Sequence, residues 1–189
     1  MPQSRAKRLD ARVARSRDAM QRALLELLEE APLEAITGAR VAARAGVGYA
    51  TFFRHYEDVR ALLVDTVAAL TDDLARAMMP ALVAGDGKGA AVALVEAVAA
   101  RRAVFHALLA GAGDALRAEM ARQVIERVAI LPDVSPSWLP RRLAMRVAVV
   151  STIELLDWWL REEPEREPAD VAALLERLVI AQFAEAPIG

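Results

Sequence analysis

The sequence predicts an all-α protein, and three observations carry this prediction. Aromatic residues make up only 5% of the 189 residues, and alanine supplies much of the 56% hydrophobic share, a balance that suits closely packed helices. Apolar residues recur at the i, i+3, i+4 spacing of a helix face in several segments. Glycine and proline clusters separate these segments, and we find no strand-like alternation of apolar and polar residues.

The first helix is expected over residues 16–30, where an apolar stripe at helical spacing precedes a proline. Pro32 ends this helix, because the residue before a proline is disfavoured in the helical conformation. Residues 1–15 are polar and basic and lack the apolar stretch of a secretory leader, so we expect a flexible basic arm there. The stripe consists of Met20, Ala23, Leu24, Leu27 and Leu28.

Residues 36–56 predict two short helices joined by a tight turn. Thr37 is a suitable N-cap for the first of them, and Gly46 supplies a left-handed turn residue. Ala42 and Ala45 are small enough to let the two helices cross closely. This is the helix-turn-helix pattern, whose second helix enters the DNA major groove. By itself the pattern also fits an ordinary helical hairpin.

A wider match separates these two interpretations. Residues 16–63 resemble the N-terminal DNA-binding domain of the TetR family of transcriptional regulators, through a leading amphipathic helix, the runs VAARAGV and ATFFRHY, and the paired leucines of a fourth helix. Gly48 stands where the family often has Ser, and Val59 stands where it often has a phosphate-contacting Lys. We expect DNA contacts from Thr37, Gly48, Tyr49, Ala50, Thr51, Phe53, Arg54, His55 and, in place of the missing Lys, Arg60.

Basic residues gather toward the N-terminus. Residues 1–60 hold 11 Lys and Arg against 8 Asp and Glu, whereas the whole chain has a formal net charge of −2. This asymmetry fits a DNA-facing N-terminal part. The arm over residues 1–15 is either a solvated tail or a segment that follows phosphates or the minor groove, and the sequence leaves both alternatives open.

Glycine, proline and charge delimit the remaining helices. Asp58 caps the fourth helix, and Pro80 is expected to end it before a glycine-rich loop over residues 85–89. The next helical stretch is interrupted near Arg101 and Arg102. The expected helices cover residues 58–79, 90–110, 114–131, 140–162 and 169–183.

The TetR resemblance implies how these helices are organised. An N-terminal three-helix helix-turn-helix DNA-binding domain would be joined by a fourth helix to a C-terminal helical ligand-binding and dimerisation bundle. We therefore expect a flexible arm over residues 1–15, a DNA-binding domain over 16–60 and a ligand-binding and dimerisation domain over 61–189.

The same resemblance implies a homodimer built from the last two long helices, which here carry more apolar residues than one packing contact needs. The alternative is that both stripes serve only the core within one chain. The expected interface residues are Val150, Ile153, Trp158, Leu175, Leu178 and Phe183.

A ligand pocket among the middle helices is likewise implied by the resemblance. Methionine and phenylalanine at helical spacing equally fit a filled core, and His106 equally fits an exposed or satisfied histidine. The candidate pocket residues are Phe105, His106, Leu109, Met120, Val124, Met145, Val149 and Thr152.

The residue inventory argues against an enzyme. The chain has no Cys and only two His, His55 and His106, so a metal site would need mainly carboxylates. No phosphate-binding, dinucleotide-binding, nucleophile-elbow or zinc-protease motif occurs. We expect no catalytic residues, cofactor or metal. Charges interrupt every long apolar stretch, so no membrane span is expected.

The sequence therefore predicts a cytoplasmic, homodimeric transcriptional regulator with two partners, a double-stranded DNA operator and a small-molecule effector. It would most simply be a repressor that the effector releases from a palindromic operator. The alternative is an all-α small-molecule-binding or adaptor protein without specific DNA binding, which the departures at Gly48 and Val59 keep open.

Overall fold

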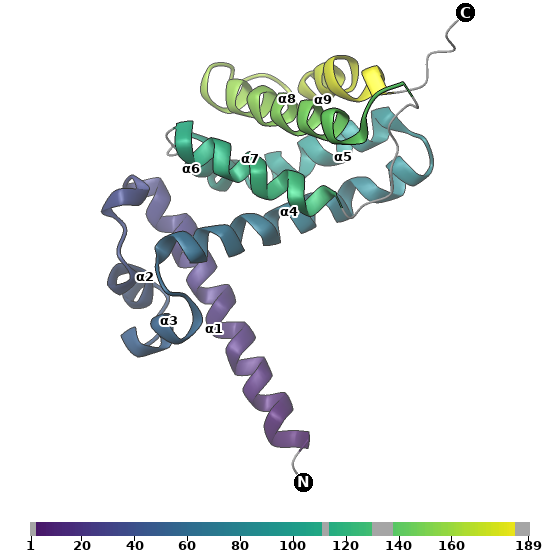
Figure 1. The fold of residues 1–189 in the computed structure, drawn as a ribbon. Helices are drawn as coiled ribbons and strands as arrows, with labels where there is room; N and C mark the ends of the chain where they lie inside the picture. Colours follow the sequence, from purple (N-terminus) through teal and green to yellow (C-terminus); the bar gives the residue numbers. More distant parts are fainter. Residues whose placement is uncertain (1–2, 111–113, 130–137, 184–189) are drawn as a thin grey trace, which may run out of the picture. The chain divides into compact units, whose positions relative to one another are not determined.

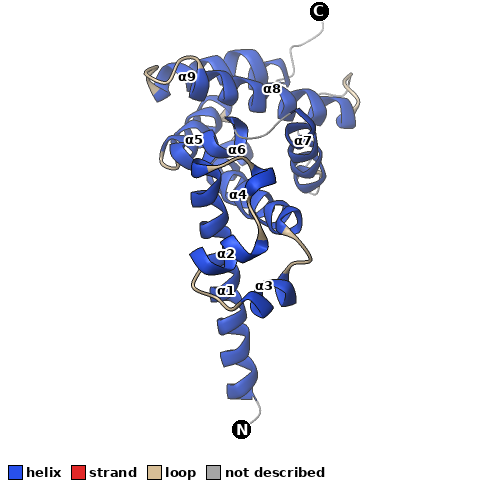
Figure 2. Cartoon of the chain, turned by 90° about the vertical axis from the view of Figure 1, so that its left-hand side faces the viewer, coloured by secondary structure: helices blue, strands red, loops and turns tan. Residues whose placement is uncertain are grey.

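A computed structural model describes residues 3–110, 114–129 and 138–183, and every regular element within these ranges is a helix (Figures 1 and 2). The predicted all-α fold is therefore confirmed. The chain divides into two compact units, residues 1–66 and 67–189. The division falls inside helix α4 (Val59–Val83), whose first turns bury Leu62 and Leu63.

The first unit is built around the apolar stripe of its first helix. The stripe is buried as predicted, and Val41 and Phe52 are fully buried with it. The first helix packs against the second, and the second packs against the third. Besides the start of α4, the elements of this unit are α1 (Gln3–Glu30), a 3-10 turn at Leu33–Ala35, α2 (Gly38–Arg44) and α3 (Tyr49–His55) (Figure 1).

Helix α1 begins at Gln3, earlier than the expected start at Ser16. The segment expected as a flexible arm therefore has a helical backbone from Gln3 onward. Its composition explains the extension, because residues 3–15 contain no Gly or Pro and are rich in Ala and Arg, which favour helix.

The described part of the second unit surrounds its core with helical segments that follow the remainder of α4. Helix α5 packs against α9, and α8 packs against both α6 and α7. Trp159, Val95, Val98 and Val171 are fully buried. The segments are α5 (Gly87–Ala99), α6 (Arg102–Ala110), α7 (Asp114–Val128), α8 (Arg141–Arg161), α9 (Pro168–Leu175) and a π-helical turn at Glu176–Ile180, with a 3-10 turn at Ala181–Phe183 after it.

Two helix boundaries differ from the expectation around the glycine-rich loop. Helix α4 continues past Pro80, which removes one N–H donor near the helix end but does not stop the last turn. Helix α5 begins at Gly87, because the Asp86 carboxylate caps it by accepting a hydrogen bond from the Gly89 N–H at 2.7 Å. The break near Arg101 and Arg102 is confirmed.

The last helix widens into a π turn after Leu175, where a continuous helix over residues 169–183 was expected. Val171, Leu175 and Val179 are all buried. Four residues rotate slightly more than one turn of an α-helix, so side chains at this spacing drift gradually around the helix. The wider π turn compensates for that drift. The π turn thus keeps these three side chains on one buried side.

Candidate nucleic-acid interface and ligand cavity

The turn between α2 and α3 has the predicted geometry. The Thr37 Oγ1 atom accepts a hydrogen bond from the Arg40 N–H at 3.3 Å and so caps α2. Gly46 lies in the left-handed region with a φ of 65°. Nothing lies within 4 Å of the Cβ that a larger residue would place there. The backbone conformation, rather than the available space, therefore favours glycine at this position.

A second glycine, which the sequence analysis did not identify, sets how closely α2 and α3 approach. A Cβ atom on Gly38 would lie 2.7 Å from Cε1 and 2.9 Å from Cδ1 of Phe52. The Phe52 ring is fully buried, so it has no free space to move into. The available signal was a glycine inside a predicted helix, which often marks a close approach.

Helix α3 presents exposed side chains on the side away from Phe52. Tyr49 is 61% exposed and Phe53 is 48% exposed, and their ring centroids lie 4.8 Å apart. The Arg54 Nη2 atom donates to the Thr51 Oγ1 atom at 3.2 Å, which orients the guanidinium along the helix. The outer side of α3 therefore combines aromatic surface with hydrogen-bonding groups.

The other predicted DNA-facing residues flank this row. Gly48 is the N-cap of α3 and, as the sequence indicated, provides no side-chain cap. Ala50 and Thr37 are exposed, and His55 is half-buried in the last turn of α3. The structure thus places these positions along α3 and at the start of α2.

Arg60 is exposed in the first turn of α4, and Val59 beside it is half-buried. Asp58 caps this turn, as expected, by accepting a hydrogen bond from the Ala61 N–H at 2.7 Å. The start of α4 therefore keeps one exposed cation although Val59 supplies none.

A carboxylate in α4 holds the end of α3 against α1. Tyr56 at the C-terminal end of α3 donates its hydroxyl to Asp65 Oδ2 at 2.5 Å, and Gln21 Nε2 donates to the same oxygen at 3.0 Å. Arg17 donates two N–H groups, one to each Asp65 oxygen. Because three segments meet at one carboxylate, Asp65 fixes the orientation of α3 within the first unit.

The charges of this network shift the pKa values of its members. Burial opposes ionisation of Asp65, but the hydrogen bonds from Arg17 and Tyr56 outweigh it and lower the pKa of that carboxyl. Burial, followed by the hydrogen bond to Asp65, raises the pKa of the Tyr56 hydroxyl. The carboxylate is therefore ionised, and the phenol is neutral, at neutral pH.

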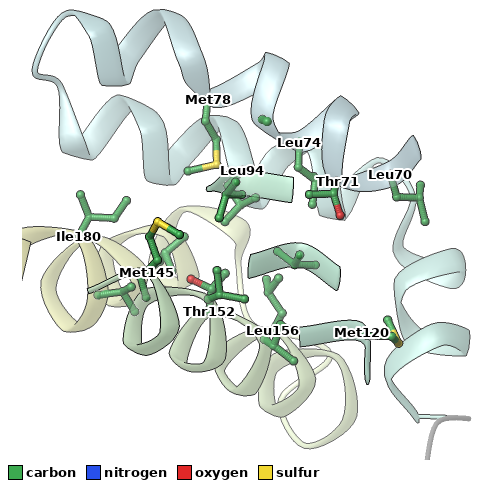
Figure 3. A pocket seen from close by; sticks show the side chains of 18 of the residues that line it. Leu70, Thr71, Leu74, Met78, Leu94, Met120, Met145, Thr152, Leu156 and Ile180 are labelled. Atoms are coloured by element: carbon green, nitrogen blue, oxygen red, sulfur yellow. The ribbon is translucent and has the colours of Figure 1, made fainter. Parts of the chain in front are cut away.

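The second unit contains a half-open cavity of about 670 Å³ (Figure 3). Its volume lies in the range of small-molecule sites, which is about 300 to 1,000 Å³. Helices α4 and α8 both line it along one side of the helix, and α5, α6, α7 and the α9 region complete it. Figure 3 shows Leu74 and Met78 of α4 and Met145 and Thr152 of α8 around this space.

All the predicted pocket residues except His106 line this cavity. His106 is exposed, because it lies on the outer side of α6 while Phe105 and Leu109 lie on the inner side. The sequence analysis did not identify the α4 side of the cavity. The missed α4 residues are Val67, Leu70, Thr71, Leu74, Ala75, Met78, Met79, Leu82 and Val83.

The predicted interface residues separate into different environments. Val150 is 39% exposed and Leu178 is 54% exposed. Leu175 is buried, and it lines the cavity together with Ile153. Trp158 is half-buried with the Arg166 guanidinium 5.3 Å from its ring centroid. The Phe183 side chain lies outside the described residues.

Leu175 is therefore corrected to a position of the chain's own interior, whereas Ile153 is half-buried and lines the cavity. The helical period explains the difference, because Leu175 is in phase with buried Val171, and Ile153 is in phase with Val149 on the cavity side. The outer side of α8 instead presents Leu143 and Val147, one turn apart, in line with Val150.

The described residues contain no group of three or more His, Cys, Asp or Glu side chains that would hold a metal ion. Within the same part of the chain, no helix is both long and apolar enough to cross a membrane.

Comparison with solved structures identifies proteins of the same fold. A TetR transcriptional regulator from Streptococcus agalactiae 2603V matches with a TM-score of 0.62 and 21% identity, over 92% of this chain and 98% of that one. The fatty acid degradation regulator FadR from Bacillus halodurans matches with a TM-score of 0.63 and 14% identity, over 90% and 97% of the two chains.

A third structure, the TetR family repressor FadR of Thermus thermophilus in complex with lauroyl-CoA, matches with a TM-score of 0.58 and 19% identity, over 92% of this chain and 98% of that one. No protein-family model matches the chain, and no curated protein matches it. At these identities the similarity establishes the fold. The fold that the sequence resemblance implied is therefore confirmed.

Proposed function

We propose that this chain, whose fold is that of TetR-family transcriptional regulators, is a ligand-responsive DNA-binding regulator. It acts as a repressor that a small molecule releases from a palindromic operator, and it works in the cytoplasm, where that operator lies. The observation that carries the proposal is that one chain combines two features. Its first unit has a helix with exposed side chains suited to contacting DNA, and its second unit has a cavity of the size of small-molecule sites.

Helix α3 is the proposed reader because its inner and outer sides have different roles. Phe52 and Tyr56 are buried and fix the helix, so the exposed Tyr49 and Phe53 are not needed for the fold. Tyr49, Thr51, Arg54 and His55 carry hydrogen-bonding groups that suit base edges and phosphates in a major groove. Arg60, exposed at the start of α4, is the proposed phosphate contact.

The cavity is the proposed effector site. Its lining is almost entirely apolar, so the effector has a large apolar part. The similar regulator from Thermus thermophilus was solved with lauroyl-CoA, which makes that molecule the first effector to test here. Helix α4 contributes Asp65 to the first unit and a row of cavity residues to the second, so it is the proposed link between effector and reader.

A homodimer would place two α3 helices on one DNA duplex. The outer side of α8 supports this part of the proposal, because Leu143, Val147 and Val150 form an exposed apolar row. We propose that these three residues and Leu178 form the dimer interface. Leu175, which the sequence analysis also expected there, is buried within one chain. A two-fold dimer reads a palindromic site whose half-sites lie one or more helical turns apart.

The test compares binding to a duplex selected from a random pool with binding to a scrambled duplex, by fluorescence anisotropy across a salt series. We expect Tyr49→Ala to weaken binding to the selected duplex by roughly 1 to 3 kcal/mol and to lower the protein's preference for the selected over the scrambled duplex. Arg60→Ala should weaken both duplexes alike and reduce the salt dependence.

The matched control is Trp138→Ala, which removes a similarly exposed aromatic side chain, 58% against 61%, from the second unit. It should leave both affinities unchanged. If Tyr49→Ala leaves the ratio of the two affinities untouched, or if no duplex is selected at all, α3 is not a DNA reader and the proposal fails.

A further inference from the structure

Two exposed aromatic rings form one patch on the outer side of α3. Tyr49 is 61% exposed, and Phe53, one turn later, is 48% exposed. Their ring centroids lie 4.8 Å apart, with the ring planes tilted by 59°. Among the described residues of the first unit, the only other large hydrophobic side chain exposed to a similar degree is Val13 in α1. Exposed apolar surface is therefore concentrated on the helix proposed to contact DNA.

The Phe53 ring is held in place from within the first unit. It packs edge-on against the Phe52 ring, with a centroid distance of 5.2 Å and an interplanar angle of 76°. Phe52 is fully buried and lies closely against Gly38. A row of rings thus connects the core to the surface and presents Phe53 in a fixed position. A side chain held in this way loses little conformational freedom when it contacts a partner.

Phe53 carries no hydrogen-bonding group, which limits what it is able to contact in DNA. The major groove presents hydrogen-bond donors, hydrogen-bond acceptors and one apolar group, the C5-methyl group of thymine. Covering a phosphate with an apolar ring would remove water from a charge without replacing its hydrogen bonds. The thymine methyl group is therefore the chemical match for Phe53.

The separation of the two rings fits the stacking of bases. Successive base pairs lie about 3.4 Å apart along the duplex, so the 4.8 Å between the centroids lies between one and two such steps. Tyr49 and Phe53 are therefore able to contact methyl groups on nearby base pairs. Arg54, which Thr51 orients, supplies hydrogen-bond donors beside the two rings.

We propose that Phe53 is a specificity-determining residue of α3, which selects half-sites that place a thymine methyl group against its ring, with Tyr49 covering the same or a nearby methyl group. The inference rests on the proposed function and deepens it, because it assigns the apolar feature of the operator that α3 recognises. It concerns which bases are preferred, whereas the proposed function concerns whether the chain binds a specific duplex.

The experiment uses the full chain and the duplex selected from a random pool. Deoxyuridine replaces the thymines one position at a time, in both half-sites together, which removes the methyl group and keeps every hydrogen-bonding group. Fluorescence anisotropy gives the affinities. At one or two positions we expect deoxyuridine to weaken binding about three- to fivefold per half-site, the factor that corresponds to burying one methyl group.

Phe53→Ala should bind the thymine and deoxyuridine duplexes equally well at these positions, because the ring that contacts the methyl group is gone. Phe53→Leu keeps an apolar side chain and should retain part of the difference. The matched control is Val13→Ala, which removes a similarly exposed apolar side chain, 44% against 48%, from α1 and should retain the full difference. The deoxyuridine series on the wild type tests the inference even if Phe53→Ala is unstable.

Three results would overturn the inference while leaving specific DNA binding in place. They are selected half-sites without thymine, a deoxyuridine series without effect at every position, and an undiminished difference in Phe53→Ala. A chain that selects no duplex contradicts the proposed function itself, and the inference fails with it.

Discussion

At the scale of single residues, the contact between Gly38 and Phe52 decides how α3 is seated. We expect Gly38→Ala to lower the free energy of unfolding by about 1 to 3 kcal/mol, because the new methyl group would lie 2.7 Å from a ring that is fully buried. Urea unfolding followed by circular dichroism measures the change.

Gly48→Ala is the control for this substitution. A Cβ atom at Gly48 would lie 3.7 Å from Thr51 Oγ1, an ordinary contact, and the residue has a φ of −68°. Gly48→Ala should therefore lower the free energy of unfolding by less than Gly38→Ala does. If both variants lose the same stability, the cost comes from the lost glycine itself, and the Phe52 contact is not the cause.

Asp65 gives the first unit a defined acid sensitivity. Its folded-state pKa is lowered by the hydrogen bonds from Arg17 and Tyr56. The stabilisation is therefore fully present above the ordinary carboxyl pKa of about 3.9 and is lost as the pH falls through the lowered value.

We expect Asp65→Asn to be less stable than the wild type at pH 7 by about 1 to 3 kcal/mol, with a difference that shrinks below about pH 4. Urea titrations at a series of pH values measure it, with the exposed Asp18→Asn as a control for the loss of one carboxylate. A difference that stays constant down to acid pH would show that the charge of Asp65 does not contribute.

At the scale of elements, α8 has two apolar sides with different surroundings. One side, from Ala144 to Leu156, lines the cavity, and the other presents Leu143, Val147 and Val150 to the surface. A helix with one packed face exposes few large apolar side chains, so the second side calls for a partner.

The proposed partner is α8 of a second copy. We expect Val147→Asp combined with Val150→Asp to convert a dimer to a monomer, because two carboxylates would be buried without counter-ions. Light scattering at micromolar concentration reports the mass. Ala69→Asp, an exposed substitution on α4 away from the cavity, is the control. A wild type that is already monomeric would contradict this assignment.

At the scale of the whole molecule, the proposed function requires that the cavity and α3 affect each other through a free energy of coupling. Such couplings typically amount to about 1 to 3 kcal/mol, or roughly 5- to 150-fold in affinity, and they are reciprocal. An effector that weakens DNA binding must therefore bind more weakly to the DNA-bound protein by the same factor.

We expect Ala148→Phe to remove the effector response while leaving DNA affinity intact, because the ring would occupy the middle of the α8 lining. Operator affinity with and without lauroyl-CoA measures the response. Arg142→Gln, an exposed substitution on α8 that does not line the cavity, should respond like the wild type. An effector that binds equally well in the presence and absence of operator DNA would show that the two units are not coupled.

The sequence by itself determined those features that depend on neighbours along the chain. The Thr37 cap, the left-handed Gly46, the break between α5 and α6 and the buried stripe of α1 were all predicted correctly, because capping, backbone conformation and helical period are local properties.

Only the tertiary structure decided what each apolar side of a helix faces. The apolar stripes of α1 and α4 have the same period. Other side chains pack against the first, whereas much of the second lines a cavity. Leu175 and Leu178 are three residues apart, and one is buried while the other is 54% exposed. Gly38 matters because Phe52, distant in sequence, lies against it. Periodicity fixes the direction of a side chain, whereas its surroundings depend on segments far along the chain.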